Sequence, residues 1–396
     1  MKIVHVEDTF HPDTGYQLNL LSKYMVAAGH QVTIITAKTE KLPKDFMSFF
    51  GSQNIVERDQ EFTHRYGVKI IRIPTKGYYS GRVVLSKKFL NAIKNEKPDA
   101  VFIHGNDTLT AMRYLLHWKK MKYPLILDSH MLEMAAKNKL KKIFRKVYRM
   151  FFSPVIIKNK IPVIRTQDSD YVEKAFGIPL SQAPWISTGS DTMLFKPDMD
   201  VKSLMKQNNN ITDDTFVVTY AGKLDEAKGG LFLANTLHKK IDAQKKICFV
   251  IIGNTTGDYG ELVEKRFKES HNRILRYPTQ KYADLASFFQ MSDVVVFPKQ
   301  CSLSFYDAQA CGVPVIFEGN EINSKRACCN NALTFKSDDE DDFREKIIKM
   351  VDMPSNDFKQ ICDNAMNYVK DSYDYKKICD IYLDVIKKEV DRVKKE

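Results

Sequence analysis

The sequence predicts two α/β domains, each built on a parallel, doubly wound sheet. Short β-rich runs alternate with helix-length segments along the chain. The alternation forms two series, separated by a stretch rich in Gly, Pro, Ser and Asp at residues 189–199. The length of 396 residues also exceeds what one hydrophobic core usually holds, so two domains of comparable size are expected.

Each series is read from its strand-like runs. The first contains "KIVHV", "QVTIIT", "KIIRI", "DAVFIH", "PLILD", "PVIRT" and "APWIS", and the second contains "FVVTYAG", "KICFVIIG", "RILRY", "DVVVFP" and "PVIFEG". Helices are expected between them, for example at residues 231–239 and 282–291, and an amphipathic helix from about Tyr375 ends the chain. We therefore expect a first domain at 1–198, a second at 199–370, and a terminal helix at 371–396 that packs back on the first.

Charge and composition narrow the classes of function. Lys and Arg number 61 against 49 acidic residues, and the net charge of +12 favours polyanions, anionic membranes or phosphorylated substrates. The seven cysteines form no metal-binding or disulfide pattern, so we expect reduced packing residues. The apolar runs are too short for a bilayer span, and the chain opens on a strand-like run instead of a signal peptide. A cytoplasmic protein is expected.

Ligands of open α/β sheets bind beside the carboxyl ends of the strands, so the loops there carry the candidate residues. In "YAGKLDEAKGG", Gly222 precedes Lys223 and Lys228, whose amines could converge on a diphosphate together with free helix N–H groups. Two solvated lysines are the alternative. Gly15 would let the backbone approach a ligand before the first helix, although a tight turn explains it equally well.

Two further loops offer an acid, hydroxyls and an imidazole. "SDVVVFPKQCSLSFYDAQACGVPVIF" supplies Ser302 and Ser304 and places Asp307 near the first turn of a short helix. The Asp307 carboxylate could accept two ribose hydroxyls, or it could merely complement the helix dipole. In "LILDSHMLE", Asp128 and His130 follow a strand. His130 could bind a sugar hydroxyl or polarise a reacting group, and a structural histidine is the equal alternative.

Taken in order, the N-terminal strand and glycine loop, "ISTGSDTMLFKP", "AGKLDEAKGG" and "YDAQACGVPVIF" resemble the signatures of the retaining glycosyltransferases of family 4. The resemblance implies the GT-B fold, two Rossmann-like doubly wound domains facing an inter-domain cleft. It implies a UDP- or GDP-linked sugar as donor and a glycan or lipid-linked acceptor in cell-surface polysaccharide or glycolipid synthesis. It implies no metal ion and no cofactor.

The resemblance also implies roles for residues. Lys223 and Lys228 would bind the diphosphate and stabilise the charge that develops on it, and Asp307 would hold the ribose. His130 could align the acceptor with the anomeric carbon. The base would lie beside Tyr277, Pro278 and Thr279.

Some positions depart from the family pattern. Lys299 stands eight positions before Asp307, where the family usually has a glutamate that contacts the transferred sugar. Tyr16 follows Gly15 in place of a second glycine, and Thr188 replaces the usual asparagine. A catalytically inactive nucleotide-binding protein of the same fold is therefore the alternative function. Nucleic-acid binding is disfavoured, because the sequence has no zinc finger, RNP-like segment or basic-aromatic platform.

Residues 137–152, "KNKLKKIFRKVYRMFF", combine seven basic residues with an apolar stripe at helical spacing. This pattern suits a helix on an anionic membrane surface, which would make the protein peripheral on the inner face of the cell membrane. An ordinary helix that buries the stripe is the equal alternative. The stripe consists of Leu140, Ile143, Phe144, Val147 and Phe151.

Overall fold

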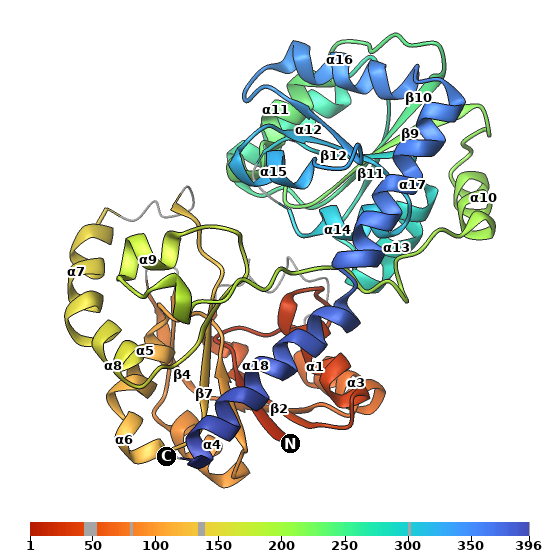
Figure 1. Ribbon diagram of the computed structural model, residues 1–396. Helices are drawn as coiled ribbons and strands as arrows, with labels where there is room; N and C mark the ends of the chain where they lie inside the picture. The colour runs from red at the N-terminus through yellow and green to blue at the C-terminus, as the bar shows by residue number, and fades with distance from the viewer. Residues whose placement is uncertain (43–53, 80–81, 134–138, 300–301, 396) are drawn as a thin grey trace. The chain divides into compact units, whose positions relative to one another are not determined.

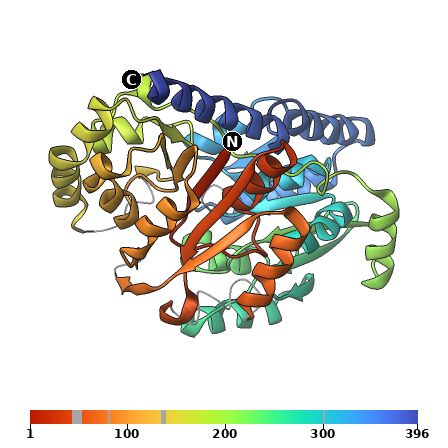
Figure 2. The same ribbon diagram turned by 90° about the horizontal axis from the view of Figure 1, so that it is seen from below.

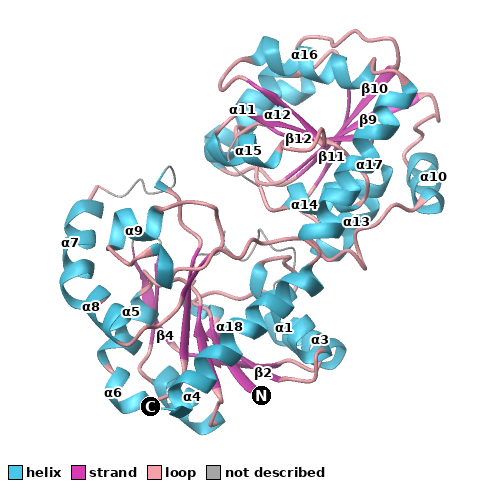
Figure 3. Cartoon of the chain, viewed as in Figure 1, coloured by secondary structure: helices cyan, strands magenta, loops and turns pink. Residues whose placement is uncertain are grey.

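The chain forms two compact units in the computed structural model (Figure 1), which describes residues 1–42, 54–79, 82–133, 139–299 and 302–395. Unit 1 contains the described residues up to Thr188 and those from Tyr375 onward, and unit 2 contains Gly189–Asp374. Each unit holds a six-stranded parallel sheet flanked by helices, as Figure 3 shows. The predicted fold class, two α/β units with parallel sheets, is confirmed.

The sheet of unit 1 has the order β3-β2-β1-β6-β7-β8. Its four central strands are buried on both faces, which explains why their sequences are almost continuously apolar. The direction of winding reverses at β1, so the loops after β1 and β6 flank the point where such sheets bind ligands. The strands are β1 Lys2–Val6, β2 Gln31–Ala37, β3 Lys69–Ile73, β6 Ala100–Ile103, β7 Leu125–Ser129 and β8 Val163–Arg165.

Helices cover both faces of this sheet. Val4 and Val6 of β1 pack into a core shared with α4, α5, α7 and α8, whereas His5 points to the opposite face and contacts Met25 of α1. The last helix, α18, lies beside α1 (Figure 2), where Gln17 Nε2 donates to Tyr382 Oη at 2.7 Å. The helices are α1 Gln17–Ala27, η1 Thr39–Lys41, α3 Ile55–Tyr66, α4 Lys88–Glu96, α5 Leu109–Leu116, α6 Trp118–Met121, α7 Lys141–Phe151, α8 Ser153–Lys158, α9 Tyr171–Phe176, η3 Leu180–Gln182 and α18 Tyr375–Lys395.

The sheet of unit 2 repeats this topology in the order β11-β10-β9-β12-β13-β14, so its winding reverses at β9. One face packs against α13, α14 and α17, and the other packs against α11, α12 and α16. The strands are β9 Thr215–Ala221, β10 Lys246–Ile252, β11 Arg273–Tyr277, β12 Val294–Phe297, β13 Val315–Glu318 and β14 Ala332–Phe335. The helices are α10 Met199–Asn208, η4 Glu226–Lys228, α11 Gly230–Thr236, α12 Gly257–Lys268, α13 Tyr282–Met291, α14 Ser304–Ala310, α15 Glu321–Arg326, α16 Glu340–Val351 and α17 Ser355–Ser372.

Several elements differ from the expectation. "APWIS" forms no strand, because only Trp185 bridges to Arg165. The edge strand β14 was not predicted, and neither was the antiparallel hairpin of β4 Thr75–Tyr79 and β5 Arg82–Leu85. Helix α11 ends at Thr236 instead of continuing to residue 239. Among the described residues, no helix is long and apolar enough to cross a membrane.

Candidate active site

The loop after β9 carries both candidate lysines of unit 2. Gly222 and Lys223 follow the end of β9 at Ala221. Asp225 then caps the short turn η4, because its carboxylate accepts the Lys228 N–H at 2.9 Å. Lys223 is exposed and Lys228 is half-buried. The loop therefore presents two ammonium-bearing side chains at the carboxyl edge of the sheet, where the winding reverses.

Glycines let this loop pack closely against its neighbours. Gly253, after β10, has a φ of 149°, and a Cβ there would lie 1.9 Å from the Gly222 carbonyl oxygen. Gly229 has a φ of 73°, and a Cβ there would lie 2.9 Å from Cγ of Lys299. Lys299 therefore lies directly against the lysine loop, and its Nζ is 2.5 Å from Asp338 Oδ1.

The amides at the start of α11 are already hydrogen-bonded inside the protein. Gly230 N–H donates to the Asp225 carbonyl at 3.0 Å, and Leu231 N–H donates to Tyr259 Oη at 2.8 Å. The expectation that free helix N–H groups would join the two lysines is wrong for these two amides. Lys223 and Lys228 place two positive charges in the same loop.

Asp307 lies in the first turn of α14, as predicted, but only 4% of it is exposed. Its Oδ1 accepts hydrogen bonds from Ser190 Oγ at 2.7 Å and from Tyr282 Oη at 2.9 Å. Burial raises the pKa of the carboxyl to about 7, and these two hydrogen bonds lower it only in part. Asp307 therefore releases its proton at a higher pH than an ordinary aspartic acid.

The start of α14 is held in place by Arg326. Its Nη1 donates to the Ser302 carbonyl at 3.2 Å, and its guanidinium lies over the rings of Phe305 and Tyr306. Ser302 is half-buried, as is Ser304, the first residue of the helix. Both hydroxyl-bearing residues thus lie on the segment that Arg326 contacts, shortly before Asp307 in the chain.

The last residue of β11, Tyr277, and the two residues after it are those predicted to lie beside the base. The Tyr277 ring is half-buried and forms a T-shaped contact with Phe288. Thr279 N–H donates to Asn254 Oδ1 at 3.0 Å, and Asn254 N–H donates to Thr279 Oγ1 at 3.2 Å. Pro278, between Tyr277 and Thr279, is exposed. Of the three residues, Pro278 is therefore the most exposed.

In unit 1, Asp128 on β7 joins two histidines at the carboxyl edge of the sheet. Asp128 Oδ2 lies 2.8 Å from His104 Nδ1 and 3.2 Å from His130 Nε2. Asp128 is fully buried, whereas the His130 side chain is 42% exposed. Burial disfavours both charges, but the pairing outweighs it: it lowers the pKa of Asp128 and raises that of His130 to about 9. The predicted neighbours Asp128 and His130 are in contact.

Further ionisable groups line the same edge. Glu7 and Asp8 follow β1, and burial raises the pKa of Glu7 to about 7 and that of Asp8 to about 6. Asp8 Oδ1 accepts from Thr110 Oγ1 at 2.5 Å, and Arg82 pairs with Asp107 at 2.7 Å. Sequence reasoning missed these residues. Most of them could have been found from the sequence, because they lie just after predicted strands whose carboxyl ends meet at the same edge of the sheet.

The histidine cluster also bears on metal binding. His104, Asp128 and His130 each place one potential ligand atom within 4.8 Å of the other two. The carboxylate oxygen already accepts hydrogen bonds from both rings, so hydrogen bonding alone accounts for this geometry. We therefore interpret the cluster as a hydrogen-bonded group.

Gly15 lies just before α1 in a loop fixed by its own side chains. Thr14 Oγ1 lies 2.8 Å from Asn19 Oδ1, and Asn19 Nδ2 donates to the His11 carbonyl at 3.0 Å. Gly15 itself is half-buried. Its role in ligand binding stays a prediction.

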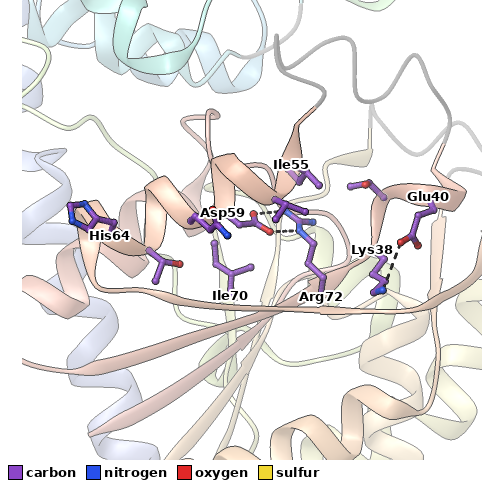
Figure 4. Close-up of a pocket in the computed structure, with 11 residues that line it drawn as sticks. Lys38, Glu40, Ile55, Asp59, His64, Ile70 and Arg72 are labelled. Carbon is purple, nitrogen blue, oxygen red and sulfur yellow. Dashed lines mark hydrogen bonds and ion pairs between the residues drawn. The ribbon is translucent and has the colours of Figure 1, made fainter.

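A pocket of about 650 Å³ opens beside β2, β3 and α3 of unit 1 (Figure 4). Arg72 crosses it and binds the Asp59 carboxylate through Nε at 2.6 Å and Nη2 at 2.8 Å. Lys38 and Glu40 form a second ion pair at 3.7 Å, and Ile55 contributes apolar lining. Because these charges are paired with one another, the pocket shows no preference for one sign of ligand charge.

Helix α7 leaves most of its apolar stripe in solvent. Only Phe144 of the stripe packs against the core, beside the fully buried Tyr148. Lys142 and Lys146 border the exposed face. Residues 137 and 138 of the predicted segment lie outside the described residues. The exposed members of the stripe are Leu140 (64%), Ile143 (64%), Val147 (41%) and Phe151 (55%).

Family models match both units. Residues 15–192 match the model described as glycosyltransferase family 4, and residues 215–353 match the model described as glycosyl transferases group 1. A search of curated proteins finds no match.

Solved structures share the fold at low sequence identity. A glycosyltransferase from Rickettsia africae is 14% identical with a TM-score of 0.74, and the match covers 98% of each chain. HepE from Anabaena, in complex with UDP-glucose, is 15% identical with a TM-score of 0.73, over 98% of this chain and 100% of that one. A sucrose-phosphate synthase from Thermosynechococcus elongatus is 16% identical with a TM-score of 0.70, over 98% of each chain. With the GT-B fold and family matches in both units, the chain belongs to the group 1, family 4-like glycosyltransferases.

Proposed function

We propose that the chain is a retaining glycosyltransferase that moves a sugar from a UDP-sugar to a glycan or lipid-linked acceptor, in cell-surface polysaccharide or glycolipid synthesis. The observation that carries the proposal is the position of Lys223 and Lys228 at the winding reversal of unit 2, with Asp307 at the same edge of the sheet. The UDP-glucose complex of HepE supports a uridine nucleotide. The family resemblance supports retention of configuration.

The donor would be held mainly by charge. Lys223 and Lys228 bind the diphosphate, and they stabilise the negative charge that grows on it as the glycosidic bond breaks. No metal ion is needed for that role. Ser190 and Tyr282 both occupy Oδ1 of Asp307, so Oδ2 is the oxygen that a ribose hydroxyl would reach.

Lys299 stands where the family usually has a glutamate that contacts the transferred sugar. Its position in unit 2 favours the view that other groups make this sugar contact over the view that the contact is lost. Its side chain lies on Gly229 of the lysine loop, with its ammonium 2.5 Å from the exposed Asp338. Ser302 and Ser304 follow on the fixed segment before and at the start of α14. We propose that these hydroxyls and nearby amides take over the sugar contact. The alternative is an inactive nucleotide-binding protein, and a turnover assay distinguishes it from an active glycosyltransferase.

His130 is proposed to contact the transferred sugar or the acceptor. Its side chain is the exposed member of the cluster at the winding reversal of unit 1, while Asp128 behind it is fully buried. A ring held in this way can align the acceptor with the anomeric carbon.

A lipid-linked acceptor is supported by α7. Four large apolar side chains are exposed on one face, and two lysines border that face. Apolar residues can enter the headgroup boundary of an anionic bilayer while lysines attract its surface. We propose that α7 docks the protein on the inner face of the cell membrane, where a lipid-linked acceptor is presented.

Calorimetry with UDP and uridine tests the donor site. Lys223→Ala and Lys228→Ala should each weaken UDP binding by about 1 to 3 kcal/mol, because each removes a charge-assisted contact with the diphosphate. Uridine binding should change little. Lys239→Ala, an exposed lysine after α11, is the control with the same loss of charge. Equal losses for UDP and uridine would contradict the assignment.

A further inference from the structure

Two adjacent cysteines, Cys328 and Cys329, lie in the loop between α15 and β14 of unit 2. Both are exposed, and their sulfur atoms are 3.0 Å apart. The other described cysteines are buried or half-buried. The expectation that the cysteines are packing residues is therefore wrong for this pair. Two thiols that face solvent are in direct contact.

The loop is attached to α14 at both of its ends. At one end, the Arg326 guanidinium lies over the rings of Phe305 and Tyr306. At the other end, Asn331 Nδ2 donates to Gln309 Oε1 at 3.0 Å, and Gln309 Nε2 donates to the Asn331 carbonyl at 2.8 Å. Asn331 Nδ2 also donates to the Arg326 carbonyl at 3.1 Å, which joins the two ends. The two cysteines therefore lie in a short bridge between two residues that both contact the helix of the candidate ribose acid.

The contact between the sulfur atoms favours a disulfide over a metal site. A structural zinc ion usually takes four protein ligands. Among the described residues, only His104, Asp128 and His130 bring three potential ligands together, so the cysteine pair has no third His, Cys, Asp or Glu ligand within reach. A disulfide needs only the two sulfur atoms, at about 2.05 Å from each other.

We propose that Cys328 and Cys329 form a thiol–disulfide exchange site, which a small disulfide of the glutathione class oxidises to a bond between the two adjacent residues. The thiolate of one cysteine attacks the small disulfide, forms a mixed disulfide and releases one small thiolate. The thiolate of the other cysteine then attacks the protein sulfur of the mixed disulfide, and the second small thiolate leaves. Two electrons pass from the pair to the small disulfide, and the two protons end on the two released thiols.

Closing this ring should disturb α14. Neighbouring Cα atoms are about 3.8 Å apart across a trans peptide bond, whereas a disulfide usually joins Cα atoms about 4.4 to 6.8 Å apart. The backbone between Arg326 and Asn331 must therefore change when the ring closes, and both of these residues contact α14. Exposed and strained disulfides are also easily reduced, so the change should be reversible.

Peptide mapping of the full chain tests the site. The protein would be treated with oxidised glutathione, its remaining thiols would be alkylated, and trypsin would release residues 327–336, which contain these two cysteines and no other. We expect this peptide to be two hydrogens lighter and unalkylated, and dithiothreitol to restore both thiols. Cys362→Ser, at a half-buried cysteine of α17, is the control and should give the same result, whereas Cys328→Ser should not. A peptide that is alkylated twice, that carries glutathione alone, or that is linked to another cysteine would overturn the proposal.

Hydrogen exchange of the ligand-free protein tests the effect on α14. The amides of residues 304–310 should exchange several-fold faster after oxidation, and dithiothreitol should restore the original rate. Cys328→Ser, treated in the same way, should show no change. A disulfide that forms without faster exchange in α14 would overturn the link between the pair and this helix. Both measurements are made without nucleotide, so their failure is distinct from a failure of the proposed function.

Discussion

Replacing Asp307 with asparagine should make the ligand-free protein more stable at alkaline pH. The pKa of this carboxyl is raised from 3.8 to about 7, chiefly by burial. The unfolded chain is ionised above about pH 4, whereas folded Asp307 keeps its proton until about pH 7, so folding takes up a proton between these values. Stability should therefore fall as the pH rises through this window.

The size of the effect follows from the shift. A displacement from 3.8 to about 7 corresponds to roughly 4 kcal/mol of destabilisation above pH 7, at about 1.4 kcal/mol per unit. Asparagine keeps a carbonyl oxygen to accept the hydrogen bonds of Ser190 and Tyr282, and it carries no charge to bury. We expect Asp307→Asn to gain about 2 to 4 kcal/mol near pH 8 and almost nothing near pH 4.

Urea unfolding followed by two probes measures this gain. Far-UV circular dichroism follows both units, whereas tryptophan fluorescence follows unit 1 alone, because Trp118 and Trp185 both lie there. The gain should appear in the circular dichroism and not in the fluorescence. Asp213→Asn, at an exposed acid in unit 2, is the control. An Asp307→Asn protein no more stable than wild type near pH 8 would refute this reasoning.

The same variant should bind UDP more weakly by about 1.5 to 3 kcal/mol, because the ribose loses a charged acceptor. Gly253→Ala should destabilise unit 2 by several kcal/mol, because the new Cβ would lie 1.9 Å from the Gly222 carbonyl oxygen at a φ of 149°. Thermal unfolding measures this loss, and a loss under about 1 kcal/mol would contradict the close packing of the two loops. Replacing both Ile143 and Phe151 by asparagine should reduce co-sedimentation with anionic vesicles. Replacing Leu116, which is 69% exposed on α5, by asparagine is the control and should not reduce it. Equal sedimentation of the wild type, the α7 variant and the control would exclude α7 as the docking helix.

The central strands could be predicted from the sequence, because they are buried on both faces and their sequences are almost unbroken apolar runs. Of the four edge strands of the two sheets, β3, β8 and β11 were predicted and β14 was not. "ALTF" is short and only half-buried, so the pattern of β14 is weak, and "APWIS" has a strand-like composition but pairs at Trp185 alone. Edge segments have fewer partners, so local composition decides less of their structure.

The candidate residues show the same limit. Their positions after strands could be read from the sequence, but their partners depend on strand register. Parallel pairing places His5 beside Phe102, so His104 falls two residues further along on the same face and reaches His5. The contact of Asp307 with Ser190 joins residues far apart in the chain, and no local pattern contains it.

Turnover is the most direct test of the central claim that this chain transfers a sugar from a UDP-sugar. The purified protein would be incubated with each UDP-sugar that binds, together with lipid or glycan acceptor extracts, and UDP release would be measured. We predict release above buffer with at least one donor, its loss when Lys223 and Lys228 are both changed to alanine, and a slower rate in His130→Ala with donor affinity little changed. No release with any donor that binds, across several acceptor extracts, would contradict the claim and identify an inactive nucleotide-binding protein.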